Sequence, residues 1–504
     1  MTAIPILSRF VTPRQTIKTL FRFFKRPKHL KTRPNLSQLA QNPAKLPRFV
    51  RESPVAMRYL HLLGPLAWDQ FPERNLNETR GVPPMPYAPF VAACLVKLNQ
   101  GFVYMSQLRE FLAEHPALMW VLGFQLVASR YTSWGFDAEA SLPTHRHFTR
   151  MLRTIPNAVL QFLLDSAIHL LQAELASVVD DFGQAISMDT KHIVAWVKEN
   201  NPKAYLKNSE RYDKKRQPKG DPDCRLGCKR RRNQRASAKE SPPTPPDNPV
   251  PANTISVGEF YWGYGSGVVA TKVPDWGEFV LAELTQPFNR SDVSYFSPLM
   301  GDVERRLDFR PRWGAFDASF DAWYVYAHFH RQDQTDPDAA FAAVPFSVRG
   351  GHRLSFDPDG LPLCKAGLPM PLKSTYWSKR SLVEHECGIY VCSLRFPAVT
   401  DQVCPIEHKN WSKKHGCTTR IPTSIGARIR YQLDRQGDAY KLVYKQRTAT
   451  ERVNSQAVAL GIERPKIRNG HAIANQNTLI YVLINLRALH RVRRRKARLG
   501  LALA

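Results

Sequence analysis

The chain is organised around the stretch from Tyr444 to Glu451, which reads Tyr-Lys-Gln-Arg-Thr-Ala-Thr-Glu. It follows a run that resembles a strand, 440–443, and leads into a helical run, 452–460. If the helix includes this stretch, Tyr444, Arg447 and Glu451 share one face, because positions i, i+3 and i+7 are neighbours on a helix. A carboxylate binds divalent metal, an Arg grips phosphate, and a Tyr stacks or donates a hydrogen bond. The stretch therefore suits phosphodiester chemistry.

A second interpretation gives Glu451 no chemical role. Thr448 and Glu451 have the spacing of a capping box, in which the two side chains satisfy backbone N–H groups at the start of a helix. Such start signals are common in helical sequences. The choice between the two interpretations depends on whether other acidic residues of the chain have a place beside Glu451.

The composition indicates a globular protein with a polyanionic partner. The 504 residues suffice for two to four domains, and a hydrophobic share of 43% suffices for packed cores. Lys and Arg total 72 against 43 Asp and Glu, a formal net charge of +29, and nucleic acid is the usual partner of so basic a chain. No apolar run reaches the ~18 residues of a membrane span. We therefore expect a soluble, cytoplasmic protein that binds no membrane.

The predicted basic N-terminal arm, 1–53, has no acidic residue before Glu52. Two interpretations fit an Arg-rich, acid-poor start: an organelle transit peptide, or an arm that lies along a phosphate backbone. The basic character persists to the C-terminus, which favours the arm. Eight cysteines occur without a secretory signal, so we expect reduced thiols and no disulfide framework.

Residues 54–180 are predicted to form a helical DNA-binding domain. Apolar residues recur at helical spacing in 89–98, 106–114 and 157–175. A short helix that opens at Thr144 carries basic residues at spacings of four and three, namely Arg146, Arg150 and Arg153. This face fits a DNA groove or a row of phosphates, and it equally fits an ordinary solvated helix face.

Residues 181–349 are predicted to form the first part of an α/β core. One buried strand, 185–189, ends in Asp189, and a later short strand, 312–317, ends in Asp317. An Asp at a strand end is well placed to face a site, although Asp also favours turns. Asp321, which heads the next helix, is the alternative to Asp317. The other elements expected here are strands at 259–272, 278–284 and 343–348 and a helix at 294–307.

Two insertions interrupt the core. The first, 198–252, is a predicted loop whose basic cluster, expected to touch nucleic acid or solvent, includes Lys229, Arg230 and Arg231. The second, 350–425, is rich in Cys and Pro. Its Cys and His residues could complete a tetrahedral zinc shell, but no CxxC pair is present, which favours dispersed thiols over structural Zn²⁺. Residues 426–504 then complete the core with the Glu451 helix and a basic C-terminal helix, 475–489.

Three carboxylates, Asp189, Asp317 and Glu451, lie 128 and 134 residues apart in the sequence, so only folding brings them together. Two-metal phosphoryl transfer uses such a cluster to hold Mg²⁺ ions about 4 Å apart. A cluster of acidic residues would be a local exception to the positive charge of this chain. A metal site inside a DNA-binding surface predicts such a cluster.

The chain resembles the DDE-type transposases of bacterial insertion sequences, in the group with a Tyr, two residues, Arg, three residues, Glu, six residues, Lys signature. Tyr444, Arg447 and Glu451 match its first three members, while Val458 stands at the position of the Lys. Met188, Asp189 and Thr190 look like the first-Asp segment, and 316–321 looks like the second. The resemblance implies a ribonuclease H-like mixed five-stranded sheet with flanking helices, preceded by a helical N-terminal domain.

The resemblance also implies a function. A DDE transposase binds the inverted-repeat ends of its element, nicks there by hydrolysis and joins 3′-hydroxyls to target DNA with Mg²⁺ or Mn²⁺. We expect double-stranded DNA as partner, a homodimer in the synaptic complex, and a bacterial, nucleoid-associated location. Tyr444, Arg447 and the basic clusters would bind DNA, and the three acids would bind metal. The alternatives are an inactive, transposase-derived DNA-binding protein and a stand-alone ribonuclease H-like nuclease.

Overall fold

The computed structural model describes residues 34–76, 84–229, 259–330, 339–347, 354–379, 381–411 and 415–503. Most of the predicted N-terminal arm and two members of the basic cluster, Arg230 and Arg231, lie outside these residues. The chain divides into two compact units. The first contains Met1–Leu170 and His471–His490, and the second contains Leu171–Gly470 and Arg491–Ala504.

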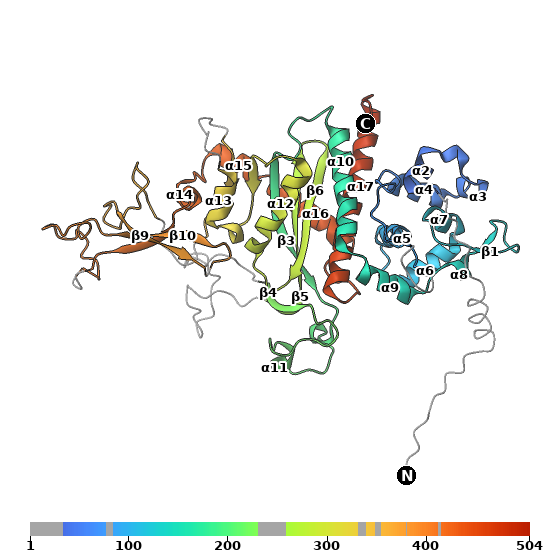
Figure 1. Ribbon diagram of the computed structural model, residues 1–504, viewed down its shortest axis with the longest axis horizontal. Coiled ribbons are helices and arrows are strands. Elements are labelled where there is room, and N and C mark those ends of the chain that lie inside the picture. Colours follow the sequence, from blue (N-terminus) through green and yellow to red (C-terminus); the bar gives the residue numbers. More distant parts are fainter. Residues whose placement is uncertain are drawn as a thin grey trace, which may run out of the picture. The chain divides into compact units, whose positions relative to one another are not determined.

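The first unit is helical (Figure 1). The helices predicted at 89–98, 106–114 and 157–175 are confirmed, and the short basic helix begins at His145 with Thr144 as its N-cap. The described α-helices of this unit are α2 (Leu36–Gln41), α3 (Arg48–Arg51), α4 (Pro54–Leu63), α5 (Tyr87–Gln100), α6 (Met105–Glu114), α7 (Pro116–Val121), α8 (Ala138–Ser141), α9 (His145–Thr154), most of α10 (Asn157–Leu175) and most of α17 (Gly470–Arg498).

Buried amide groups fix α17 within this unit. Asn475 is fully buried and donates from Nδ2 to the carbonyl oxygens of Leu152 and Ile155, at 2.8 Å each. Its Oδ1 accepts from Asn157 Nδ2 at 3.0 Å. A buried amide is stable only when its hydrogen bonds are made, so these contacts set the position of α17 along its axis. Residues 471–490, expected in the core completion, thus group with the helical unit.

Helix α10 is the one described helix that is long and apolar enough to cross a membrane by length and composition. Half of that apolar stretch is buried inside the structure. A core helix of this length passes the same test, because burial against other helices selects the same side chains as lipid does.

The second unit is built on a curled, mixed sheet of six strands: β3 (Ala185–Val194), β4 (Arg225–Lys229), β5 (Glu259–Val273), β6 (Gly277–Pro287), β7 (Trp313–Ala315) and β8 (Phe341–Ala343). The order is β4-β5-β3-β7-β8, and β6 pairs with β5 on the same side as β4. Long β5 pairs through 259–263 with β4 and through 264–273 with β6. Strand β3 is antiparallel to β5 and parallel to β7, so the sheet changes direction at β3.

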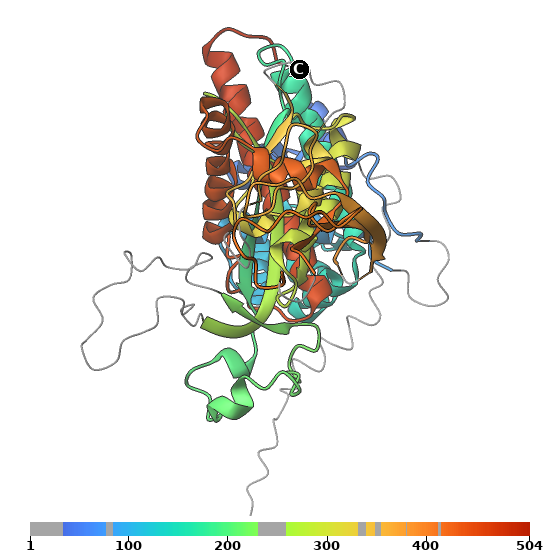
Figure 2. The same ribbon diagram turned by 90° about the vertical axis from the view of Figure 1, so that its left-hand side faces the viewer.

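Three predictions for this sheet need correction. Strand β3 does not end at Asp189 but continues to Val194, because β5 pairs with it that far. The last strand lies at Phe341–Ala343, earlier than expected. The 198–252 segment is not all loop, since Arg225–Lys229 forms β4, and helix α11 (Asn208–Arg211) lies beyond the sheet end where β4 meets β5 (Figures 1 and 2).

Helices cover both faces of the sheet. Side chains alternate along β3, so Asp189 faces α16 (Arg447–Ala459) while Thr190 faces the other side and donates to Asp292, just before α12 (Phe296–Leu307). Gly267 of β5 allows the close approach on the α12 side, because a Cβ there would lie 2.9 Å from Tyr295 Cγ. The two helices therefore sandwich the strands that carry the acidic residues.

The second unit also contains the Cys-rich insertion. It forms a three-stranded antiparallel sheet, β9 (Leu372–Ser378), β10 (His385–Val391) and β11 (Thr418–Pro422), in the order β11-β10-β9. Helices α13 (Trp323–Phe329) and α14 (Ile425–Gln432) lie on either side of it in the sequence and pack against each other. The chain thus leaves the six-stranded sheet and returns to it at one place (Figure 1).

After α14 the chain forms α15 (Asp438–Tyr444) and then α16. The strand predicted at 440–443 is therefore wrong. Tyr440 and Val443 are three residues apart, and in the helix both side chains pack on Ala343 of β8. A short apolar run has no periodicity of its own, so the packing surface decides between helix and strand.

Candidate functional site

The pairing of β3 with β7 brings the two aspartates together. The strands are parallel, with Ser187 opposite Ala315, a sequence offset of 315 − 187 = 128 residues. Asp189 and Asp317 are separated by the same 128 residues, so each lies two residues beyond this last pair. Neighbouring strands are ~4.8 Å apart. Residues at corresponding positions point to the same face, so the two carboxylates lie on one side of the sheet, and each lies within electrostatic range of the other.

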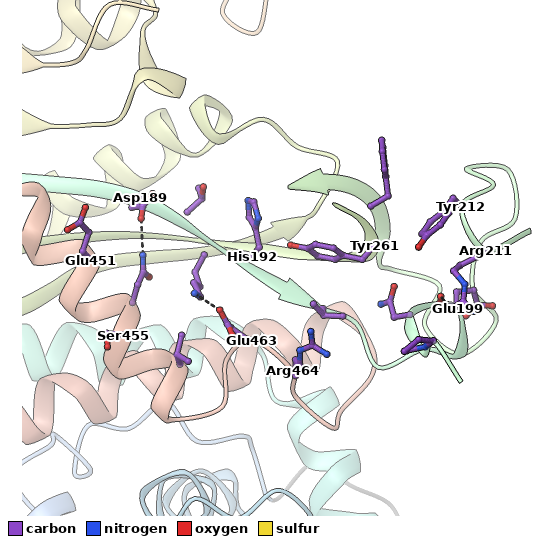
Figure 3. Close-up of a pocket in the computed structure, with 18 residues that line it drawn as sticks. Asp189, His192, Glu199, Arg211, Tyr212, Tyr261, Glu451, Ser455, Glu463 and Arg464 are labelled. Atoms are coloured by element: carbon purple, nitrogen blue, oxygen red, sulfur yellow. Dashed lines mark hydrogen bonds and ion pairs between the residues drawn. The ribbon is translucent and has the colours of Figure 1, made fainter. Parts of the chain in front are cut away.

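Helix α16 adds the third acid on the same side. Asn454, one turn after Glu451, donates from Nδ2 to Asp189 Oδ2 at 3.0 Å and anchors the helix to β3. Figure 3 shows this bond and shows Glu451 beside Asp189. Glu451 also lines the same cleft as Asp189, and its side chain is 57% exposed. All three predicted acids are thus gathered in one region.

The capping-box interpretation of Glu451 is not supported by the contacts at the start of α16. The N-cap residue is Gln446, and no side chain caps this end. The hydroxyl of Thr448 donates to the carbonyl oxygen of Lys445. Glu451 Oε1 instead lies 3.6 Å from Arg447 Nη2.

Tyr444 and Arg447 lie together although they belong to different helices. Lys445 and Gln446 keep right-handed helical backbone angles, so α15 passes into α16 through a tight turn. Arg447 donates from Nη1 to Tyr444 Oη at 3.1 Å, and its guanidinium carbon lies 5.6 Å from the Tyr444 ring centroid. The guanidinium also interacts with the charges of Asp189 and Asp317. Arg447 therefore interacts with all three predicted acids.

Electrostatics at Asp189 reflect this crowding. Burial raises the pKa of Asp189 to about 6, and the negative charge of Asp317 acts in the same direction. The backbone N–H of Thr190 and the charge of Arg447 oppose the rise without cancelling it. Two neighbouring carboxyl groups are hard to ionise together, and a bound cation favours the ionised form of both.

Asp321, the alternative to Asp317, has a different environment. Its side chain is 1% exposed and forms a bidentate ion pair with Arg430, at 2.8 and 2.7 Å. Tyr326 Oη and the backbone N–H of Ser347 also donate to its oxygens, at 2.7 Å each. The Asp317 carboxylate accepts only from Ser319 among the hydrogen bonds described. Asp317 thus keeps oxygen lone pairs for a ligand, while those of Asp321 are used within the fold.

Two clefts meet at the acids. The larger, about 1040 Å³, contains Asp189 and Glu451, and the smaller, about 520 Å³, contains Asp189 and Asp317. The larger is also lined by Asn454, Val458 and basic or aromatic side chains from β3, β5 and the segment after α16: Lys191, His192, Tyr261 and Arg464. Asn454 and Lys191 were not singled out from the sequence. The sequence could have indicated Asn454, because it follows Glu451 by three positions and so lies on the same helix face.

The position of the signature Lys opens into this cleft but holds Val458, which is 38% exposed. Two cations that follow Glu451 in the sequence, Arg452 and Lys466, have partners elsewhere. Arg452 donates to Glu278 at 2.6 Å, and Lys466 lies over the Trp196 ring, so neither lines the larger cleft. The Lys and Arg side chains that line this cleft are Lys191, which pairs with Glu463 at 2.5 Å, Arg211 and Arg464.

Among the described residues, no group of three or more His, Cys, Asp or Glu side chains stands arranged to hold a metal ion. At the acids the side chains are turned toward protein partners, Asp189 to Asn454, Asp317 to Ser319 and Glu451 to Arg447. The chemistry of the donors nevertheless fits Mg²⁺ or Mn²⁺, because three carboxylates supply hard oxygen ligands.

The predicted DNA-binding residues outside this site that the structure describes lie on α9 and at the end of β4. Arg146, Arg150 and Arg153 are all exposed on α9, in the helical unit. Lys229 ends β4, and Arg230 and Arg231 lie outside the described residues. At the C-terminus, Lys496 is buried and paired with Glu174, so part of the expected basic end is used inside the fold.

No model of a known protein family matches the chain, and a search of curated proteins finds no significant match.

Proposed function

We propose that this protein is a DDE-type DNA transposase that binds the ends of its element and performs metal-dependent cleavage and strand transfer. The observation that carries the proposal is the meeting of Asp189, Asp317 and Glu451 on one side of the sheet, from two parallel strands and one helix. Acids from three distant parts of a chain with a net charge of +29 have no evident structural reason to gather there.

The sheet topology supports a ribonuclease H-like core. Strands β3, β5 and β6 pair antiparallel and come in this order along the chain, with β4 between β3 and β5, and β7 and β8 extend the sheet on the other side in parallel. The order β6-β5-β3-β7-β8 gives a mixed five-stranded sheet, as expected of that core, and β4 is an addition at the end of β5. The Glu451 helix packs on β3, as the third acid of such a core requires.

Each side chain of the site has a role under this proposal. Asp189, Asp317 and Glu451 would hold Mg²⁺ or Mn²⁺, which when bound lowers the pKa of an attacking water or 3′-hydroxyl and stabilises the leaving oxygen. Asn454 orients Asp189. Arg447 and Lys191 offer donors to phosphate oxygens, and Tyr444 holds the Arg447 guanidinium through its hydroxyl.

The test uses the DNA that flanks the coding region. Inverted repeats found there are placed on a supercoiled plasmid and incubated with the protein, target DNA and Mg²⁺ or Mn²⁺. We expect nicks at the repeat ends and joined products. Replacing Asp189 or Asp317 by Asn, or Glu451 by Gln, should lower both by about 100-fold or more, because each change removes a metal ligand.

The control is Asp438→Asn, since Asp438 is a fully exposed acid on α15. It should keep wild-type activity, and all variants should keep the wild-type circular dichroism spectrum. Wild-type cleavage by a folded variant of any of the three acids would refute the assignment. Cut ends without joined products would instead identify a nuclease with the same core.

A second candidate is a DNA-binding protein without catalysis, and Val458 favours it, because the signature Lys position in the cleft carries no charge. Binding of Mn²⁺ separates the two candidates. A catalytic site takes up Mn²⁺ through Asp189, Asp317 and Glu451, measured by calorimetry or electron paramagnetic resonance. A pure binder shows no uptake that these three substitutions remove.

A further inference from the structure

We propose that the Cys-rich insertion contains a structural zinc site formed by the four thiolates of Cys364, Cys392, Cys404 and Cys417. These residues are spread over 54 positions of the sequence, 364 to 417 inclusive, and lack the CxxC pairs that usually mark zinc ligands. The site is independent of the proposed catalytic acids, because all four residues belong to the insertion and line a separate cavity of about 490 Å³.

Three of the thiols are already in contact. The Cys417 thiol is within hydrogen-bonding contact of both Cys364 and Cys392, and none of the three forms a disulfide. Two sulfurs bound to one tetrahedral zinc ion are about 3.8 Å apart, as follows from a Zn–S distance of ~2.3 Å. That separation is close to the reach of a hydrogen bond between thiols. The three thiols are neighbours, but among the described residues no three such side chains are arranged to hold a metal ion as they stand, so the trio must reorient to share one.

Turns and close backbone contacts occur at these cysteines. A reverse turn begins at each of Cys364, Cys392 and Cys404. In each turn the Cys carbonyl oxygen accepts from the backbone N–H three residues later, at 2.9, 3.1 and 3.1 Å. The backbone N–H of Cys392 donates to the carbonyl oxygen of Cys417 at 3.0 Å. Gly416 lies so close that a Cβ on it would be 2.9 Å from the Cys392 sulfur. Tight turns thus place three separate cysteines beside the one cavity that they line with Cys417.

Cys404 is the fourth ligand rather than the neighbouring His408. Both line the cavity. His408 Nδ1, however, accepts the backbone N–H of Asn410 at 3.3 Å, which fixes the ring to its own turn. Cys404 is 8% exposed and has no such bond among those described. Since no described group of three or more such side chains is arranged to hold a metal ion as it stands, the trio must reorient and the Cys404 thiol must approach it on binding.

The insertion has a physical need for such a crosslink. In β9, Leu372–Trp377 are exposed at every position, and Tyr376 and Trp377 expose 41% and 57% of their surfaces, so this strand buries almost no core. Small domains with few buried apolar residues are usually held by metals or disulfides. Each coordinating thiol releases its proton to solvent on binding, and the binding free energy adds to the stability of the folded insertion.

The test measures metal in the full-length protein, produced with zinc present and purified under reducing conditions. We expect elemental mass spectrometry to find one zinc ion per chain. X-ray absorption should give a shell of sulfur ligands at about 2.3 Å. Less than a tenth of a zinc per chain after incubation with Zn²⁺, a different metal, or a shell of nitrogen and oxygen ligands would each overturn the proposal.

Variants locate the site. Cys364→Ser, Cys392→Ser, Cys404→Ser and Cys417→Ser should each lower zinc content at least tenfold after dialysis against a moderate chelator. Cys387→Ser is the matched control, because Cys387 is a buried free thiol of β10 whose neighbour is Tyr376, outside the cavity. It and His408→Gln should keep full zinc. Retention of zinc in the four variants, or its loss in the Cys387 control, would overturn the assignment. If a variant misfolds, X-ray absorption of the wild-type protein still shows whether four sulfur atoms bind the zinc.

Discussion

At the scale of single residues, the environment of Asp189 is the most informative. Its carboxyl is largely buried beside Asp317, and the burial raises its pKa to about 6 from an ordinary value of 3.8. Between these two values the folded state holds a proton that the unfolded chain has released. The contribution of Asp189 to stability is therefore fully present below about pH 4 and is lost as the pH rises through about 6.

This gives a prediction for Asp189→Asn, which removes the titration. Without divalent metal, the free energy of unfolding of the variant, relative to wild type, should rise by on the order of 1–3 kcal/mol between pH 4 and pH 7, since each pKa unit corresponds to ~1.4 kcal/mol. Urea unfolding across this range measures it, with Asp180→Asn, a change at an exposed aspartate, as the control. Parallel pH profiles for Asp189→Asn and wild type would contradict the buried, crowded environment of Asp189.

At the scale of elements, the ion pair of Asp321 with Arg430 connects parts of the chain on either side of the insertion. Asp321 precedes α13, and Arg430 lies on α14, 109 residues later. The chain then continues into α15 and α16, which carry Arg447 and Glu451. The pair therefore fixes where the chain resumes after the insertion, and so helps to place Glu451 near Asp189.

We predict that Asp321→Asn lowers the free energy of unfolding by about 3 kcal/mol, because it leaves the half-buried Arg430 guanidinium without its countercharge. Asp317→Asn should cost less than about 1 kcal/mol, since its described hydrogen bonds are to the neighbouring Ser319 and Asn can accept them. Chemical denaturation of both variants in parallel is the measurement. Equal losses in the two variants would mean that Asp317, like Asp321, serves the fold.

The elements also show what the sequence could and could not predict. Helical periodicity sufficed for α5, α6 and α10, and apolar, β-branched content sufficed for β5 and β6. It failed at 440–443, where the packing of Tyr440 and Val443 on Ala343 selects a helix. It also missed β4, whose pairing with β5 outweighs its charged composition.

The candidate site was predicted to a similar degree. The order of acids along the chain indicated Asp189, Asp317 and Glu451, but their proximity depends on the register of β3 with β7 and on the contact of Asn454 with β3. Neither is encoded in local spacing. The thiol cluster could not be predicted for the same reason, because Cys392 meets Cys417 only when β10 and β11 have paired as far as Val391 and Thr418.

At the scale of the whole molecule, the excess positive charge has more than one use. Some of it is internal, as in Arg493 and Lys496, which pair with buried Glu174. Much of it is exposed, as in Arg146, Arg150 and Arg153 on α9. The segment 1–33 adds nine Lys and Arg without an acidic residue, a composition that fits a phosphate-binding arm.

If the protein binds DNA as proposed, the dependence of that binding on salt measures how many of these charges contact phosphate. The logarithm of the binding constant falls linearly with the logarithm of salt concentration, by about 0.9 for each phosphate neutralised. Replacing the nine Lys and Arg of 1–33 by Gln should make this slope shallower by up to about 8, and Gln at Arg146, Arg150 and Arg153 by up to about 3. Filter binding or fluorescence anisotropy with one duplex from 50 to 300 mM salt gives the slopes.

If the nine replacements leave the slope unchanged, the segment does not lie on DNA, and the transit-peptide interpretation takes its place. A change in slope accompanied by loss of preference for one sequence would instead mean that the arm also reads bases, because contacts to phosphate alone weaken all sequences equally.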